Sequence, residues 1–132
     1  MQNSAPTALH ELSAHALLAG YRDGALSPVE VCQAVLARIA RWEPALAATW
    51  LLRPDDALAQ ARASEARWRK GAPLGALDGV PVTIKDNIAT QGDPVPLGTR
   101  AVALAPAAAD APPSARVREA GAVIVAKTTM PD

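Results

Sequence analysis

The segment Leu77-Asp78-Gly79-Val80-Pro81-Val82-Thr83-Ile84-Lys85-Asp86-Asn87 decides the fold of this 132-residue chain. Its first residues are typical of a turn, and Val80, Val82 and Ile84 then alternate with other residues as in a β-strand. The strand runs directly into the polar group Lys85-Asp86-Asn87. Because α/β proteins place chemistry at the carboxyl ends of their strands, this group is the first candidate for a functional site.

A second apolar run, residues 122–126, also ends in a lysine, Lys127. Between the runs we expect a long ordered loop over residues 91–109 and a helix that is capped by Asp110 and closed by Gly121. A strand, loop, helix and strand in this order is typical of a crossover unit, whose parallel strands end at the same edge of a sheet. We therefore expect Lys85 and Lys127 to emerge near each other.

Two interpretations of these lysines stay open on the residues alone. Burial or a neighbouring positive charge favours the neutral amine, so that a lysine can act as a general base near pH 7. Alternatively, Lys85 forms a structural ion pair with Asp86 or another carboxylate, and Lys127 caps backbone carbonyls. Composition alone favours the second interpretation.

The first 71 residues are expected to be mainly helical. The clearest helix start is Ser27-Pro28-Val29-Glu30, which combines a capping serine, a proline at the first helical position and a glutamate three residues after the cap. Cys32, within that helix, is interpreted as a small buried hydrophobic residue. The predicted helices cover residues 7–19 with Gly20 as terminator, 28 to Glu43-Pro44, and 54 to Lys70-Gly71, and residues 48–52 could form a strand.

Composition excludes several classes of protein. Thirteen Lys and Arg balance thirteen Asp and Glu, so there is no basic surface to bind nucleic acid or an anionic membrane. A single cysteine excludes an internal disulfide framework and favours a reducing cytoplasm, and no apolar run approaches the roughly 20 residues of a membrane span. His10 and His15 do not share a helix face, so we expect no metal and no cofactor.

Residues 77–87 resemble the strand-and-lysine motif of the amidase signature family. The likeness covers about the last 60 residues, because four further segments follow in the family's order and approximate spacing. The further segments are Gly98-Thr99, the helix start at Asp110, residues 116–122 and residues 126–129. The chain departs from the family's pattern at three places: Ala126 stands where many relatives carry Gly, Thr129 replaces a frequent Asn, and residues 94–97 replace a more Thr-rich version.

The resemblance implies an α/β fold in which this chain supplies N-terminal helices and the first crossover strands of an α/β/α sandwich around a large mixed sheet. We expect two or three strands here, so that the sandwich is incomplete in this chain. Residues 1–132 would be the N-terminal part of a single amidase-type domain. Residues 1–71 would be mainly helical, and residues 72–132 would form the strand, loop, helix and strand that carry the lysine motif.

The resemblance also implies cleavage of a carbon–nitrogen amide bond by a serine nucleophile, a second serine with a cis peptide bond, and a lysine base. By resemblance the base is Lys85. Asp86 would fix the geometry of the strand end, Lys127 would support Lys85 through charge or hydrogen bonds, and Thr99 would support the site. The substrate would be a small-molecule amide, and the family's motifs alone do not select which one.

The family's Gly- and Ser-rich signature, which supplies both serines, is not found in this sequence. The chain's own serines fall in predicted helices, caps or the tail, so we expect the chain alone to be inactive. Its partner would be the remainder of the amidase domain, in the same or another chain, and a homo-oligomer is compatible with this. The serines are Ser4, Ser13, Ser27, Ser64 and Ser114.

Two other functions stay open. The chain could be part of a glutamine amidotransferase of the same family, in which glutamine donates the amide and ammonia passes to a partner. It could instead be a noncatalytic module that binds a small ligand or a partner at the Lys85 and Lys127 edge. The absence of Phe and an aromatic content of 3% predict a thin core, which weighs against an independent module.

Overall fold

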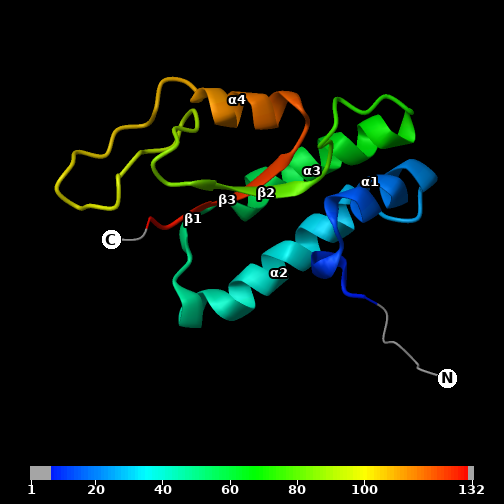
Figure 1. The fold of residues 1–132 in the computed structure, drawn as a ribbon, viewed down its shortest axis with the longest axis horizontal. Coiled ribbons are helices and arrows are strands. Elements are labelled where there is room, and N and C mark those ends of the chain that lie inside the picture. Colours follow the sequence, from blue (N-terminus) through cyan, green and yellow to red (C-terminus); the bar gives the residue numbers. More distant parts are fainter. Residues whose placement is uncertain (1–6, 131–132) are drawn as a thin grey trace.

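The computed structural model describes residues 7–130, so Ser4 lies outside the described residues. Its centre is a three-stranded sheet with the order β1-β3-β2 (Figure 1). β2 pairs with β3 in parallel, and β1 pairs with β3 antiparallel. The sheet is therefore mixed, as expected. The strands are β1 (Thr49–Leu52), β2 (Pro81–Lys85) and β3 (Val123–Thr128).

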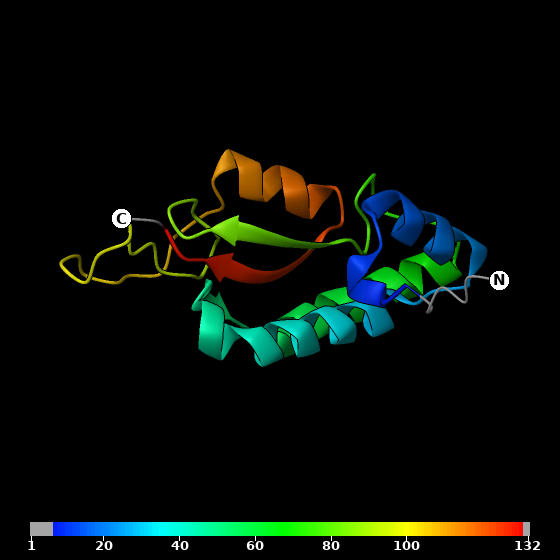
Figure 2. The same cartoon turned by 60° about the horizontal axis from the view of Figure 1, so that its bottom comes forward.

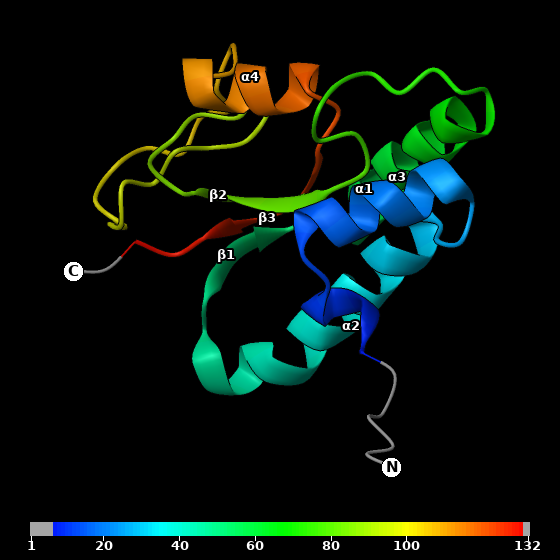
Figure 3. The same ribbon diagram turned by 45° about the vertical axis from the view of Figure 1, so that its right-hand side comes forward.

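Helices lie on both faces of this sheet. Figures 2 and 3 show α4 on one face and α2 with α3 on the other, while α1 lies beside α3 past the start of β2. The α/β fold class is thus confirmed. The helices are a 3-10 turn (Leu9–Glu11), α1 (Ala14–Asp23), α2 (Pro28–Leu46), α3 (Pro54–Arg69) and α4 (Pro112–Glu119).

The crossover from β2 through α4 to β3 is the unit predicted from the sequence. It makes β2 and β3 parallel neighbours, with a register irregularity between Val82 and Thr83. The core beneath the sheet is built from small side chains, which let α2 and α3 approach the strands closely. Cys32 is fully buried there, so its interpretation as a core residue is confirmed. The buried cluster is Cys32, Ala57, Ala61, Val123, Val125 and Ala126.

Ser27 caps α2 as its sequence context predicts. Its Oγ accepts hydrogen bonds from the backbone N–H groups of Val29 (3.0 Å) and Glu30 (3.4 Å). The same hydroxyl donates to the Glu65 carboxylate at 2.6 Å, which ties the start of α2 to α3. These bonds satisfy backbone donors that would otherwise have no partner at the helix start.

Replacing Ser27 with Ala therefore removes a cap and an interhelical bond together. We expect the free energy of unfolding to fall by about 1–2 kcal/mol. Urea denaturation followed by circular dichroism measures this change, with Ser27→Thr as the control that keeps a capping hydroxyl. An unchanged unfolding midpoint for Ser27→Ala would show that the cap contributes nothing.

The first helix differs from its prediction. Residues 9–11 form a 3-10 turn, and α1 begins after Ser13, whose Oγ accepts a hydrogen bond from Ala16 N–H at 3.2 Å. Gly20 does not end α1, which continues to Asp23 and terminates at Gly24 with φ +70°. A Cβ at Gly20 would lie 2.5 Å from Leu26 Cδ1, so this glycine makes room for packing.

Two other helix ends differ from their predictions. α2 continues through Pro44 to Leu46, because the last turn is closed beyond the proline by a bond from Ala47 N–H to the Glu43 carbonyl at 2.8 Å. Asp110 does not cap α4: the capping position is Ala111, which makes no side-chain cap bond. The carboxylate of Asp110 instead accepts bonds from Gln91 N–H and Arg118 Nε.

None of the helices between residues 7 and 130 has the length and apolar character needed to cross a membrane.

Candidate functional site

Lys85 is the last residue of β2, and its side chain is exposed. Its carbonyl accepts a hydrogen bond from Ile88 N–H at 3.0 Å, so residues 85–88 form a turn that begins at the lysine itself. The next peptide is also fixed, since Asp86 N–H donates to the Thr128 carbonyl at 3.0 Å. Among residues 7–130 Lys85 makes no ion pair. Lys85 therefore presents an accessible amine, and hydrogen bonds fix the backbone that follows it.

Asp86 points away from this amine into the protein. It is 1% exposed, and its Oδ2 accepts a bond from Gly98 N–H at 3.2 Å, while Oδ1 has no hydrogen-bond partner among the described residues. Its carboxylate therefore ties the strand end to the long loop. The ion pair of Lys85 with Asp86 or another carboxylate, which the second interpretation of the lysines allowed, is not formed among residues 7–130.

Thr99 lies next to that attachment point. Its side chain is exposed, and its hydroxyl accepts a bond from Ala101 N–H at 3.1 Å. Its own N–H donates to the Pro96 carbonyl at 3.1 Å. These local bonds shape the tip of the loop that Asp86 holds through Gly98.

Lys127 is on the neighbouring strand but on the opposite face of the sheet from Lys85. The register pairs Lys85 with Thr128 and Lys127 with Ile84, and side chains alternate between faces along a strand. The two lysines therefore lie at the ends of neighbouring parallel strands, as expected, but their side chains do not share a face. Lys127 pairs with Ile84, the residue before Lys85, so the two lysine side chains lie on opposite faces at this edge of the sheet.

Lys127 is 2% exposed, and its ammonium donates to the Ile88 carbonyl at 2.6 Å. The alternative interpretation of Lys127, as a cap for backbone carbonyls, is confirmed. Burial lowers the pKa of Lys127, while the carboxylates of Asp93 and Asp86 act in the opposite direction.

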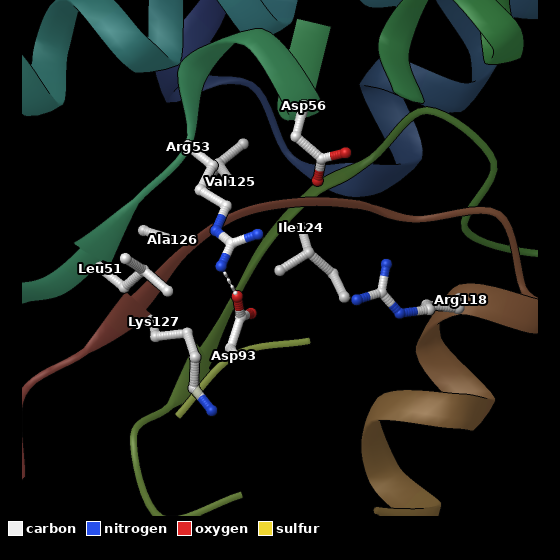
Figure 4. A pocket seen from close by; sticks show the side chains of 9 residues that line it. All are labelled: Leu51, Arg53, Asp56, Asp93, Arg118, Ile124, Val125, Ala126 and Lys127. Carbon is white, nitrogen blue, oxygen red and sulfur yellow. Dashed lines mark ion pairs between the residues drawn. The ribbon is translucent and has the colours of Figure 1, made fainter. Parts of the chain in front are cut away.

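A small pocket beside Lys127 contains an ion pair that the sequence did not predict. Arg53 Nη2 lies 2.5 Å from Asp93 Oδ1, and the side chain of Asp93 lies beside that of Lys127 (Figure 4). Asp93 Oδ2 also accepts a bond from the Thr90 hydroxyl at 2.7 Å. No sequence signal points to this pair, because Arg53 lies between β1 and α3 while Asp93 lies in an aperiodic loop.

Asp78, at the start of the lysine motif, anchors the turn that enters β2. Arg67 donates to both of its carboxylate oxygens, at 2.8 and 2.6 Å, and Leu74 N–H donates at 2.6 Å. Burial acts to raise the pKa of Asp78, but the bonds from Arg67 and Leu74 outweigh it and lower this pKa. Asp78 therefore holds the turn as a carboxylate.

The part of the chain that the structure describes contains no cluster of three His, Cys, Asp or Glu side chains that could hold a metal. What the strand edge offers chemically is an exposed amine, fixed backbone on both sides of it, and a buried cluster of charges beneath the following turn.

Residues 30–132 match the model of the family described as Amidase. A glutamyl-tRNA(Gln) amidotransferase subunit from Chloroflexus aurantiacus is 43% identical over 121 residues, which are 92% of this chain and 25% of that protein. Indoleacetamide hydrolase from Bradyrhizobium diazoefficiens is 37% identical over 114 residues, or 86% of this chain and 22% of the relative. The chain thus spans about a quarter of the length of these relatives.

Solved structures show the same likeness. A peptide amidase in complex with the competitive inhibitor chymostatin superposes with a TM-score of 0.81 at 35% identity, covering 89% of this chain and 24% of that one. The native peptide amidase from Stenotrophomonas maltophilia gives a TM-score of 0.77 at 33% identity, over 96% of this chain and 25% of that one.

Proposed function

Because the chain belongs to the amidase family, we propose that it forms the N-terminal part of an enzyme that cleaves a carbon–nitrogen amide bond, with Lys85 as the base. Residues 1–132 would belong to one amidase-type domain, whose remainder supplies two serines from the same or another chain. The observation that carries this proposal is the exposed Lys85 amine on a fixed strand end, within a chain whose relatives are amidases and amidotransferases.

In the proposed reaction the neutral amine of Lys85 takes a proton from the nucleophilic serine by way of the bridging serine. The serine oxygen bonds to the amide carbonyl carbon, and the carbon–nitrogen bond breaks as the proton returns to the leaving nitrogen. Ammonia or an amine leaves, and an acyl-enzyme ester remains. Water then attacks the ester, which releases a carboxylic acid and restores the serine hydroxyl.

Asp86, Thr99 and Lys127 are proposed as supporting residues. Asp86 would hold the strand end through Gly98, and Thr99 would shape the tip of the same loop. Lys127 would act from the other face of the sheet, through its hydrogen bond to the Ile88 carbonyl, at the far end of the turn that begins at Lys85.

A second candidate is the glutamine amidotransferase of the same family. It is favoured by the 43% identity to the glutamyl-tRNA(Gln) amidotransferase subunit from Chloroflexus aurantiacus. In that case glutamine would be the amide donor and the released ammonia would pass to a partner protein. Glutamine cleavage that depends on a copurified partner would select this candidate over an independent hydrolase.

The test is an assay of the complete protein, including the Gly- and Ser-rich segment, with primary amides that include indoleacetamide and glutamine. We expect release of ammonia, and formation of a hydroxamate when hydroxylamine competes with water for the acyl-enzyme. The 132-residue chain alone is expected to be inactive, since loss of the nucleophile and of oxyanion donors removes the covalent pathway. Turnover without any trapped hydroxamate would contradict an acyl-enzyme.

A further inference from the structure

The turn that begins at Lys85 is held at its far end by a buried charge. Ile88 closes the turn with its N–H on the Lys85 carbonyl, and its own carbonyl accepts the bond from Lys127 Nζ. A shift of the Lys127 ammonium would therefore move Ile88 and, through the turn, the backbone of Lys85. The position of Lys127 depends on what surrounds its charge, because a buried ammonium without counter-charges is costly.

Asp93 supplies a counter-charge and joins three parts of the chain. One carboxylate oxygen pairs with Arg53, at the junction of β1 and α3, and the other accepts the Thr90 hydroxyl. Its backbone N–H donates to the Thr90 carbonyl at 3.0 Å, and its carbonyl accepts from Ala107 N–H at 2.9 Å. Figure 4 shows its side chain between those of Arg53 and Lys127.

We infer that Asp93 is a positioning residue for the catalytic lysine: from the opposite face of the sheet, it holds the segment after Lys85 through Thr90 and lies beside the buried Lys127 side chain. The inference rests on the proposed role of Lys85. It assigns Asp93 no contact with substrate or with the reacting atoms. Arg53 takes part in the same positioning, because its ion pair fixes the Asp93 carboxylate relative to the sheet.

The test compares Asp93→Asn with Asp55→Asn in the complete protein. Both substitutions remove one negative charge at nearly constant volume, but Asp55 is exposed in the first turn of α3. We expect Asp93→Asn to lower kcat for an amide about 10- to 100-fold with KM changed less than about threefold, since a base displaced by about 1 Å loses this much. Asp55→Asn should leave both constants within about twofold.

Hydrogen exchange of the complete protein gives a readout that does not depend on activity. In Asp93→Asn we expect amides in residues 86–99 to exchange at least about tenfold faster, while amides of α2 and α3 keep their rates. Uniform acceleration over the whole chain would mean that Asp93 only stabilises the fold, and would overturn the inference. Unchanged exchange in residues 86–99 would overturn it as well.

Arg53→Gln is the second variant, in case Asp93→Asn does not fold. Because Arg53 is half exposed, its loss leaves the chain foldable while freeing the Asp93 carboxylate. The same local acceleration in residues 86–99 would support the inference, and its absence would overturn it. If the unmodified protein hydrolyses no amide, the proposed function fails, while the exchange pattern still decides the role of Asp93.

Discussion

Replacing Lys85 with Ala in the complete protein is expected to lower kcat/KM for a simple amide about 100- to 10,000-fold. The reason is that no other side chain at the strand end can accept the serine proton. Asp86 is buried with its carboxylate on Gly98, and Lys127 lies on the other face of the sheet with its ammonium on Ile88. Steady-state kinetics with the best amide of the panel measures the loss.

The fold should survive this substitution. Lys85 is exposed and makes no ion pair among residues 7–130, so its truncation should change the free energy of unfolding by no more than about 0.5 kcal/mol. Lys70→Ala is the matched control, because Lys70 is an exposed lysine at the end of α3. Near-normal turnover by Lys85→Ala would show that Lys85 is not the base.

The strand-and-lysine segment was predictable because its determinants are local. Alternating Val82 and Ile84 specify a strand, and the following crossover has few possible topologies, so the parallel pairing of β2 and β3 follows from chain order. The cap at Ser27 is equally local, and its serine, proline and glutamate act within one helical turn.

The relation between the two lysines could not be predicted in the same way. It depends on the register irregularity between Val82 and Thr83, and one residue of register changes the face on which a side chain lies. Sequence periodicity carries no signal for such an irregularity. Asp110 illustrates the same limit: its sequence context predicts a cap, but its carboxylate accepts hydrogen bonds from the backbone N–H of Gln91, in the long loop, and from Arg118 Nε, near the end of α4.

The ion pair between Arg53 and Asp93 could not be predicted from the sequence for a related reason. Their ion pair joins segments 40 positions apart, and neither residue stands in a motif. Only the packing of the loop against the β1–α3 junction brings them together, and Arg53 Nη2 adds a 3.5 Å bond to the Gly92 carbonyl there. The functional prediction thus came from a local motif, and the residues that hold the motif in place came from the fold.

The largest loss of stability is expected from Asp78→Ala, by about 3 kcal/mol. Asp78 is fully buried and accepts three hydrogen bonds, two from Arg67 and one from Leu74 N–H. Its removal leaves the Arg67 guanidinium, which is 29% exposed, without its carboxylate and frees the turn that enters β2. Gly121 packs so closely that a Cβ there would lie 2.9 Å from Asp78 Cα, so the backbone cannot easily close around the gap.

The same carboxylate predicts how stability depends on pH. Since the pKa of Asp78 is lowered in the folded state, its contribution is complete above the ordinary aspartate value of about 4 and is lost as the pH falls through the lowered value. The difference in unfolding free energy between the unmodified protein and Asp78→Ala should therefore be constant from about pH 6 to 8 and shrink below about pH 4. Urea denaturation across this range measures it.

A double-mutant cycle separates the ion pair from simple loss of packing. Arg67→Met leaves a buried carboxylate without its partner, so we expect it to destabilise the protein, while the double variant should cost less than the sum of the two single changes. The deficit should be about 1–3 kcal/mol, because each single variant includes the cost of an unpaired charge that the double variant avoids. Strictly additive losses would show that Asp78 holds the turn through Leu74 and packing alone, and the acid-sensitive part of the stability difference should then persist in the Arg67→Met background.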